Sequence, residues 1–361
     1  MNFDPSEEQI LLADMAGRLL ASHATQTVRD PAAEWRDCLD QGLIGLPFTE
    51  AQGGFDGGPE EVMIVMEAMG RHLSQAPYLQ SVLLAGRTLA LAGADEALTG
   101  LLAVGARHAL ALFEPGQRYR WDAPATRAEP TAEGWTISGA KVAVLDHDGE
   151  TVLLCPAATP RGLGLFLIPP GTSNVLLAIQ PTPDGRHATD VTLDAVTLPP
   201  EAAIGDPARN RAILAEAVDG AILGACAEMV GAMEQLLAIT VDYLNVRQQF
   251  GAVIGSFQAL QHRAADMLIA IERARSIMIY AASMMEAPEA RRSVAVAAAK
   301  ALVNRSARFV GQQAIQLHGG MGLASDYPAG RYFQRLTVLG MLFGDTDHQR
   351  AVVAAGGGWA G

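Results

Sequence analysis

The chain has 361 residues, of which half are hydrophobic and only 6% aromatic, and its formal net charge is −13. This length exceeds one typical hydrophobic core, so we expect two or three domains. The negative charge argues against a nucleic-acid partner, because Lys and Arg side chains that neutralise phosphates supply most of that affinity.

The cysteines and the apolar segments bear on compartment and membrane. Cys38, Cys155 and Cys226 lie far apart and match no metal-ligand spacing, and so sparse a set is typical of a reducing compartment. The start, MNFDPSEEQI, lacks the basic and apolar segments of a secretory signal. Acidic residues interrupt the apolar run 217–239, which favours a buried helix over a membrane span. We expect a cytoplasmic protein with no metal and no membrane partner.

Residues 1–107 are predicted to form a helical domain. Ser6, followed by Glu7, Glu8 and Gln9, can cap a first helix. Later apolar spacings predict helices over 60–73 and 79–93.

Residues 108–206 change to short apolar runs bounded by Gly, Pro and Asp. Five of these runs predict strands of a small, mostly antiparallel β-domain. They span 108–115, 134–145, 150–157, 162–169 and 190–199.

Residues 207–361 are predicted to be helical again. Long helices are expected over about 209–247, 256–285 and 290–317, with a last one near the C-terminus. Four helices of this kind suit a four-helix bundle.

Two of these helices meet at a loop with unusual side chains. Arg247 lies near the end of the first helix, Phe250-Gly251 breaks its pattern, and Ser256 is a suitable N-cap for the next helix. An arginine, an aromatic and a glycine in this position suit an anionic, planar ligand. The same residues also fit an ordinary corner, with Arg247 capping carbonyls and Phe250 in the core.

A second stretch, 316–335, reads QLHGGMGLASDYPAGRYFQR. Gly319, Gly320 and Gly322 follow a long helix and allow a tight turn with close backbone approach to a ligand.

Together the two stretches resemble the acyl-CoA dehydrogenase family of flavoproteins. The family's arginine-x-x-phenylalanine-glycine signature matches Arg247, Phe250 and Gly251, and its glutamine and glycine-rich turn match Gln316 and the glycines after it. The ending YFQRLTVLGMLFGDTDHQR is similar to the small-subunit type of pimeloyl-CoA dehydrogenase and to heteromeric acyl-CoA dehydrogenases. The resemblance implies an α+β, mostly α fold: a helical domain (1–107), a central β-barrel-like domain (108–206) and a C-terminal four-helix bundle (207–361).

The resemblance also implies a function. It is the FAD-dependent α,β-dehydrogenation of an acyl-CoA thioester, by a homo-oligomer or by a hetero-oligomer with a second acyl-CoA dehydrogenase subunit. Dicarboxylic, branched and polycyclic acyl groups all fit the subfamily. The implied FAD contacts are Arg247, Phe250, Gln258, Gln316, Gly319, Gly320 and Thr346.

The family's catalytic glutamate has no counterpart in the sequence. Its usual position before a Gly-Thr pair falls on Phe343 or Gly344, and its alternative position on the first bundle helix falls on Ala221. Asp345 or Asp347 is the candidate substitute base, and Asp345 also suits an N-cap.

The central domain departs from the family where flavin contacts are implied. Gly116-Gln117-Arg118 replaces the usual Gly-Ser-Asp, and Val144-Leu145-Asp146 replaces the usual Trp-Ile-Thr/Ser run. Three alternatives follow. Asp345 acts as base, the chain is a non-catalytic subunit completing a partner's site, or it is a flavin oxidase or monooxygenase of the same fold.

Overall fold

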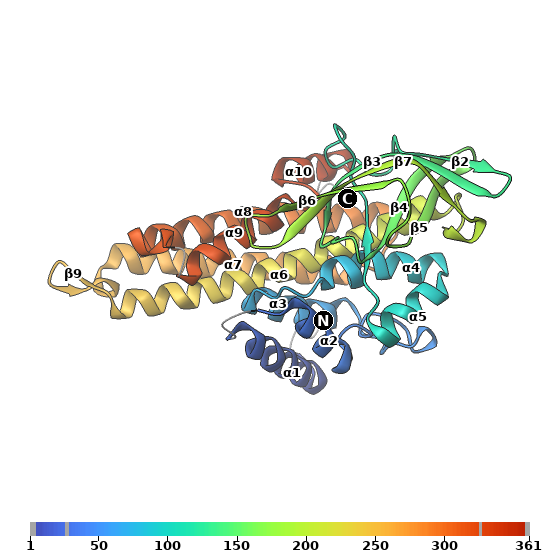
Figure 1. The fold of residues 1–361 in the computed structure, drawn as a ribbon. Helices are drawn as coiled ribbons and strands as arrows, with labels where there is room; N and C mark the ends of the chain where they lie inside the picture. The colour runs from blue at the N-terminus through green and yellow to red at the C-terminus, as the bar shows by residue number, and fades with distance from the viewer. Residues whose placement is uncertain (1–4, 26–28, 325–326, 358–361) are drawn as a thin grey trace. The chain divides into compact units, whose positions relative to one another are not determined.

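The computed structural model describes residues 5–25, 29–324 and 327–357 (Figure 1). Within these ranges no helix is long and apolar enough to cross a membrane. In the same ranges no group of three or more His, Cys, Asp or Glu side chains could hold a metal ion.

The chain divides into two compact units. The first comprises Met1–Glu34, Gly58–Gln75 and Ile222–Gly361, and the second comprises Trp35–Gly57 and Ala76–Ala221. The three-domain division expected at residues 107 and 206 stays a prediction.

The first unit begins with helix α1 (Glu7–Ala24), whose predicted cap is confirmed. The Ser6 hydroxyl accepts a hydrogen bond from the Gln9 backbone N–H at 3.2 Å, and the Gln9 side-chain oxygen accepts from the Ser6 backbone N–H at 3.0 Å. This reciprocal capping box satisfies donors that the first helical turn leaves without partners. Helix α2 (Pro31–Asp40) follows in sequence.

Helix α3 (Pro59–His72) packs closely on the long helix α6 (Asn210–Val246). A Cβ added at Gly70 would lie 1.8 Å from the Glu228 carbonyl oxygen, and one added at Gly231 would lie 1.9 Å from the Glu67 carbonyl oxygen. These two glycines therefore allow the backbones of α3 and α6 to touch, which no larger residue would permit.

The C-terminal helices confirm the predicted bundle. The bounds of the three long helices agree with the sequence to within about two residues. The helix expected near the C-terminus is instead two helices separated by a turn. The helices are α6, α7 (Gln258–Ser283), α8 (Glu289–His318), α9 (Pro328–Met341) and α10 (Thr346–Ala355), seen side by side in Figure 1.

The predicted N-cap at Ser256 is wrong. Ser256 ends a short 3-10 turn, η4 (Ile254–Ser256), and its hydroxyl donates to the Val253 carbonyl at 2.6 Å. Phe257 takes the N-cap position of α7 with an extended backbone and no side-chain cap. The serine oxygen is thus bonded back into its own turn, as Ser hydroxyls often are in loops.

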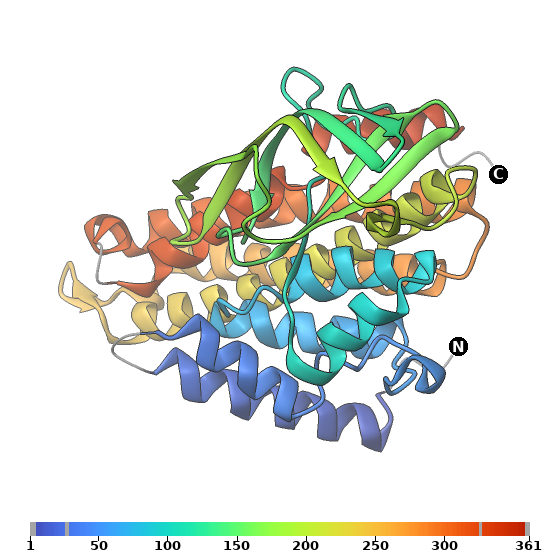
Figure 2. The same cartoon turned by 45° about the vertical axis from the view of Figure 1, so that its right-hand side comes forward.

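The second unit contains one mixed sheet, shown in Figure 2. Its order is β6-β7-β3-β2-β4-β5-β8, with β1 paired to β4 in parallel. Most neighbouring strands are antiparallel, as the sequence predicts. The strands are β1 (His108–Leu110), β2 (Arg127–Thr131), β3 (Gly134–Leu145), β4 (Val152–Thr159), β5 (Gly162–Ile168), β6 (Val175–Pro181), β7 (His187–Leu198) and β8 (Ala203–Ile204).

One buried cluster holds this sheet together. Ile137, Cys155 and Val196 are fully buried in it, and the rings of Trp135 and Phe166 meet edge to face with centroids 5.1 Å apart. The β6 strand was not predicted, because several of its apolar side chains point to solvent and give no alternating pattern.

Short helices of the second unit attach to the sheet. The π-helical segment η2 (Leu79–Gly86) is bonded to β1, because Ser81 Oγ donates to the His108 carbonyl at 2.9 Å and Gln80 Nε2 donates to the Leu110 carbonyl at 3.2 Å. Helices α4 (Arg87–Ala92) and α5 (Asp95–Val104) follow; the sequence predicted the first and missed the second. Two 3-10 turns, η1 (Glu50–Gln52) and η3 (Pro200–Ala202), also lie in this unit, whereas η5 (Gly319–Leu323) lies in the first unit.

Candidate functional site

The turn between α9 and α10 carries the first position at which the sequence resemblance places a catalytic glutamate. Phe343 is buried, and it adopts a left-handed backbone with φ of 57°. Gly344 follows with φ of 122°, and a Cβ there would lie 2.5 Å from both Gln349 Nε2 and His348 Cδ2. A side chain at 344 would therefore require the Gln349 and His348 side chains of α10 to shift, and the buried position at 343 holds a phenyl ring.

Side chains from two helices fix this turn. Gln349 Nε2 donates to the Phe343 carbonyl at 2.7 Å, and Asn304 Nδ2 donates to the Gly344 carbonyl at 3.4 Å. The turn is thus held from α10 and from α8.

Asp345 is the N-cap of α10. Its Oδ1 accepts a hydrogen bond from the His348 backbone N–H at 2.9 Å, and Thr346 is the first residue of the helix. The capping role that the sequence allowed for Asp345 is confirmed, whereas its role as a base stays a prediction. Its second carboxylate oxygen has no hydrogen bond to the described residues.

The alternative base position, Ala221, is fully buried on α6. The nearby carboxylate of Asp219 is also buried and already interacts with other residues.

Most of the predicted cofactor contacts gather at one end of the bundle. Tyr243, one turn before Arg247, has its ring centroid 4.7 Å from that of His318 on α8, and His318 is 4.9 Å from Tyr327. This aromatic cluster joins the ends of α6 and α8, and Arg247 lies one helical turn beyond its Tyr243.

A hairpin projects from this end of the bundle, labelled β9 in Figure 1. Strands β9 (Gln248–Gln249) and β10 (Ala252–Val253) are antiparallel and joined by Phe250-Gly251, both with positive φ. Phe250 is 92% exposed, with only an edge contact to the Phe257 ring, whose centroid is 6.4 Å away. The sequence alternative of a core Phe250 is therefore wrong.

The polar groups at this end are free to bind. Among the described residues, no ion pair or side-chain hydrogen bond engages the exposed side chains of Arg247, Gln258 or Gln316. Arg247 therefore does not cap the helix with its side chain. Gly319 and Gly320 are exposed, and a Cβ at either would meet no atom within 4 Å.

Thr346 lies apart from this group. The turn that precedes Thr346 is bonded to Asn304, which is twelve residues before Gln316 on α8, or about 18 Å along the helix at 1.5 Å per residue. Within one chain the predicted FAD contacts therefore form two groups: Thr346 at the α9–α10 turn, and the remaining residues at the C-terminal end of α8.

Lys300 is a buried cation that the sequence analysis did not identify. It is fully buried and donates to three acceptors: Met229 Sδ, Asn304 Oδ1 and the Leu339 carbonyl. Burial lowers the pKa of Lys300 to about 8, although Cys226 and Glu228 act in the opposite direction. The sequence feature that could have indicated this buried cation is the position of the lysine inside the apolar run VAVAAAKALV.

Lys300 and Asn304 therefore anchor both sides of the α9–α10 turn. Close by, Arg335 Nε donates to Glu228 Oε1 at 2.6 Å in a buried ion pair that joins α9 to α6. Buried charges of this kind are tolerated only when they are paired or fully hydrogen-bonded.

The second unit has its own buried ion pair, Glu114 with Lys141 at 2.7 Å. Glu114 also accepts from the backbone N–H groups of Ala125 and Thr126. Burial acts to raise the pKa of Glu114, but Lys141 and these hydrogen bonds outweigh it, so the pKa lies below its usual value.

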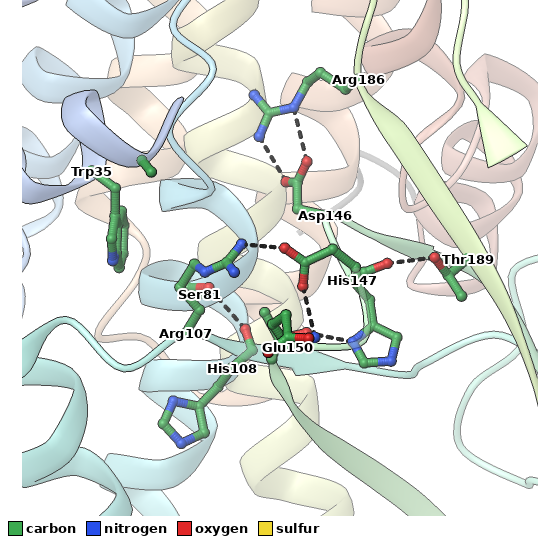
Figure 3. Close-up of polar contacts among 12 residues, drawn as sticks. Trp35, Ser81, Arg107, His108, Asp146, His147, Glu150, Arg186 and Thr189 are labelled. Carbon is green, nitrogen blue, oxygen red and sulfur yellow. Dashed lines mark hydrogen bonds and ion pairs between the residues drawn. The ribbon is translucent and has the colours of Figure 1, made fainter. Parts of the chain in front are cut away.

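The β3–β4 loop contains a denser polar cluster, drawn in Figure 3. Arg186 forms a bidentate pair with Asp146, with Nε to Oδ1 at 3.0 Å and Nη2 to Oδ2 at 2.7 Å. Arg107 Nη1 pairs with Asp148 Oδ2 at 2.8 Å. Both pairs involve residues for which the sequence suggested no contact partner.

Comparisons with known proteins agree with this geometry. The family model described as "Acyl-CoA dehydrogenase, N-terminal domain" matches residues 6–103. The family model described as "Acyl-CoA dehydrogenase, C-terminal domain" matches residues 214–358. A probable acyl-CoA dehydrogenase of Bacillus subtilis, YngJ, is 27% identical, with 98% of this chain and 99% of that protein covered.

Solved structures give the same result. The Tcur3481-Tcur3483 steroid ACAD, solved as a variant, contains a chain 30% identical to this one, with TM-score 0.85, covering 97% of this chain and 99% of that one. The ChsE4-ChsE5 complex from Mycobacterium tuberculosis shares the fold at 24% identity and TM-score 0.86, with 98% of each chain covered. On the matched domains and the 30% identity over nearly the whole length, this chain belongs to the acyl-CoA dehydrogenase family.

Proposed function

We propose that this chain is one subunit of a heteromeric acyl-CoA dehydrogenase and supplies the adenylate-side contacts of an FAD site whose base comes from a partner subunit. Dehydrogenation requires a carboxylate within reach of the α-proton of the acyl thioester. FAD supplies the hydride acceptor. The residues of this chain bind and position, and the partner removes the proton.

One observation carries this proposal. Neither Ala221 nor Phe343 nor Gly344 can accept a proton, and the carboxylate of Asp345 caps α10. The α9–α10 turn is also held by Gln349 and Asn304, which opposes any rearrangement that would bring another acid to the vacant position.

The free groups at the bundle end fit the adenylate side of FAD. An unpaired arginine can bind a pyrophosphate with two charge-assisted hydrogen bonds, which makes Arg247 the principal phosphate contact. The exposed ring of Phe250 offers a flat apolar surface, and the space above Gly319 and Gly320 allows a ligand to approach the backbone. Gln316 supplies a neutral donor and acceptor beside them.

The outer face of α7 and α8 supports a partner of different sequence. Leu268 and Ile269 of α7 and Phe309 of α8 are large apolar residues with exposed fractions of 49%, 56% and 37%. Arg263 Nη1 donates to Gln313 Oε1 at 3.0 Å, so the outward faces of the two helices are continuous. Exposed apolar patches often mark interaction surfaces, and these three residues are the reason for proposing such a surface on α7 and α8.

The charges on this face argue against pairing with a second copy. Four exposed arginines on this face have no acidic partner among the described residues, and two exposed acidic side chains lie near them. Two copies meeting through this face would bring excess positive charge together. The arginines are Arg263, Arg273, Arg305 and Arg308, and the acids are Asp266 and Glu272. We infer an acidic surface on the partner.

The similar structures support the assembly and a substrate class. The chain that is 30% identical belongs to a steroid ACAD that is named by two proteins, Tcur3481 and Tcur3483, and the Mycobacterium tuberculosis structure is a complex of ChsE4 with ChsE5. A polycyclic acyl-CoA is therefore the substrate class we favour. The cytoplasmic location expected from the sequence stays a prediction.

Co-expression tests the proposal. The chain is produced with each acyl-CoA dehydrogenase of the same genome that carries a glutamate at the base position. The expected product is a complex of both chains that contains FAD and oxidises acyl-CoA thioesters. The change Arg305→Glu with Arg308→Glu should prevent its assembly, whereas Arg36→Glu with Arg350→Glu alters the net charge equally and should not. An active homo-oligomer of this chain would overturn the proposal.

A second candidate rests on the second carboxylate oxygen of Asp345. That oxygen is not used by the N-cap, so Asp345 could serve as a substitute base in an active homo-oligomer. The Asp345→Asn variant separates the two candidates.

A further inference from the structure

We propose that this chain makes no site for the isoalloxazine ring of FAD, because a buried ion pair between Asp146 and Arg186 holds the segment that would contact the ring. This inference rests on the proposed function and specifies how the cofactor is divided.

The end of β3 is the segment concerned. Family resemblance places ring contacts at residues 144–146, where an aromatic side chain and a hydroxyl are usual. Here Val144 is buried in the hydrophobic core of the sheet, and Leu145 pairs with Ala188 of β7. Asp146 follows with φ of 53°, a left-handed turn conformation. The segment therefore presents neither a ring to stack on nor a hydroxyl to donate.

The Asp146 carboxylate is fully engaged. Both of its oxygens accept from Arg186, and the two side chains are only 12% and 11% exposed. Arg186 Nη2 also donates to the Ala76 carbonyl at 3.3 Å. Removing either partner would leave an uncompensated charge in a largely buried place, so the pair resists opening for a ligand.

Further hydrogen bonds and one ion pair fix the rest of the β3–β4 loop, as Figure 3 shows. The Thr189 hydroxyl donates to the His147 carbonyl, and the His147 ring is bonded to the Thr151 hydroxyl. Asp148 pairs with Arg107 and also accepts from the Glu150 backbone N–H at 3.0 Å. The loop is thus bonded to β7 and to the start of β1, which leaves its polar groups occupied.

In the second segment with implied ring contacts, Gly116-Gln117-Arg118, the side chain of Gln117 is already hydrogen-bonded. Gln117 Nε2 donates to Glu114 Oε2 at 3.1 Å, and Gln117 Oε1 accepts from Arg120 Nε at 3.0 Å. Arg118 has a left-handed backbone with φ of 50°. The serine hydroxyl and the aspartate expected here by resemblance are absent, so neither segment offers the ring the side-chain partners that the family uses.

The test separates the ring from the adenylate half of FAD. The full chain is titrated by calorimetry with ADP, FAD and riboflavin, and the visible spectrum of FAD is recorded in the same samples. We expect FAD and ADP to bind with dissociation constants within about threefold of each other. We also expect no riboflavin binding and an FAD spectrum that matches that of free FAD.

FAD binding at least about tenfold tighter than ADP, together with a shifted visible band, would overturn the inference. Binding of riboflavin would overturn it as well. The variant Arg247→Met should remove the binding of ADP and FAD alike, and Arg350→Met is the matched control. If neither ADP nor FAD binds to the unaltered chain, the absence of a ring site is upheld while the adenylate role in the proposed function fails.

Discussion

Asp345 and His348 are joined by a hydrogen bond in which the His348 backbone N–H donates to Asp345 Oδ1 over 2.9 Å. Asparagine can accept the same bond and alanine cannot. We expect Asp345→Asn to leave the free energy of unfolding nearly unchanged and Asp345→Ala to lower it by about 1 kcal/mol. Urea unfolding of both variants measures the difference.

The same pair of variants tests the role of Asp345 in catalysis. In the assembled enzyme, Asp345→Asn should retain the kcat of the unaltered protein, because the base belongs to the partner. A loss of kcat with an unchanged unfolding midpoint would assign the base to Asp345 and remove the need for a partner's carboxylate.

Lys300 should make stability depend on pH in an unusual direction. Because burial lowers the pKa of Lys300 from 10.5 to about 8 in the folded chain, the unfolded chain holds the extra proton between these values. The free energy of unfolding therefore rises with pH through this window, by up to about 3 kcal/mol from this group (2.5 pH units at 1.36 kcal/mol each).

Chemical denaturation at pH 7 to 10 checks this dependence by comparing the unaltered chain with Lys300→Met. The difference in unfolding free energy between the two proteins should change with pH. Lys141 is the only other lysine of the sequence and is present in both. A difference that stays constant across the window would show that Lys300 keeps an ordinary pKa.

Glu228 and Arg335 form a buried ion pair, so the stability cost of replacing one of them should depend on whether the other is present. Arg335→Met leaves the Glu228 carboxylate buried without its cation and should cost about 3–5 kcal/mol of unfolding free energy. The double change Glu228→Gln with Arg335→Met should recover much of that loss. Additive losses in this double-mutant cycle would show that the two side chains do not interact.

Phe250 should show a conflict between stability and function. Its backbone φ of 57° is unfavourable for a residue with a Cβ, and its ring is 92% exposed, so folding gains little from it. We expect Phe250→Gly to keep or raise the melting temperature of the isolated chain while weakening FAD retention in the assembled enzyme. A lower melting temperature would show that the ring contributes to this chain's own fold.

Elements set by local sequence could be predicted. The long helices follow from their apolar spacing, and the Ser6–Gln9 capping box was readable because both of its bonds join residues three apart. The N-cap prediction for Ser256 failed because its hydroxyl can bond either to the backbone N–H groups of the next helix or to its own turn. In the structure it donates to the Val253 carbonyl of that turn.

Interactions between distant residues could not be predicted in the same way. Asp146 and Arg186 are 40 residues apart, and their pairing depends on the β3–β7 register. In the sequence, Lys300 only interrupts an apolar helix. Its hydrogen bond to the Leu339 carbonyl, 39 residues away, depends on how the two helices pack. Phe250 could equally have been a core residue, and only its place at the tip of a hairpin shows otherwise.

The central claim is that this chain alone has neither a site for the isoalloxazine ring nor a base. The most direct test is the visible absorption spectrum of the chain expressed alone, recorded before and after addition of acyl-CoA thioesters that include polycyclic ones. We predict that no thioester bleaches the chain expressed alone, and that a yellow complex that bleaches forms once the glutamate-bearing partner is present. A yellow preparation of this chain alone that bleaches with a thioester would contradict the claim, because it would show a complete ring site and a working base within one kind of subunit.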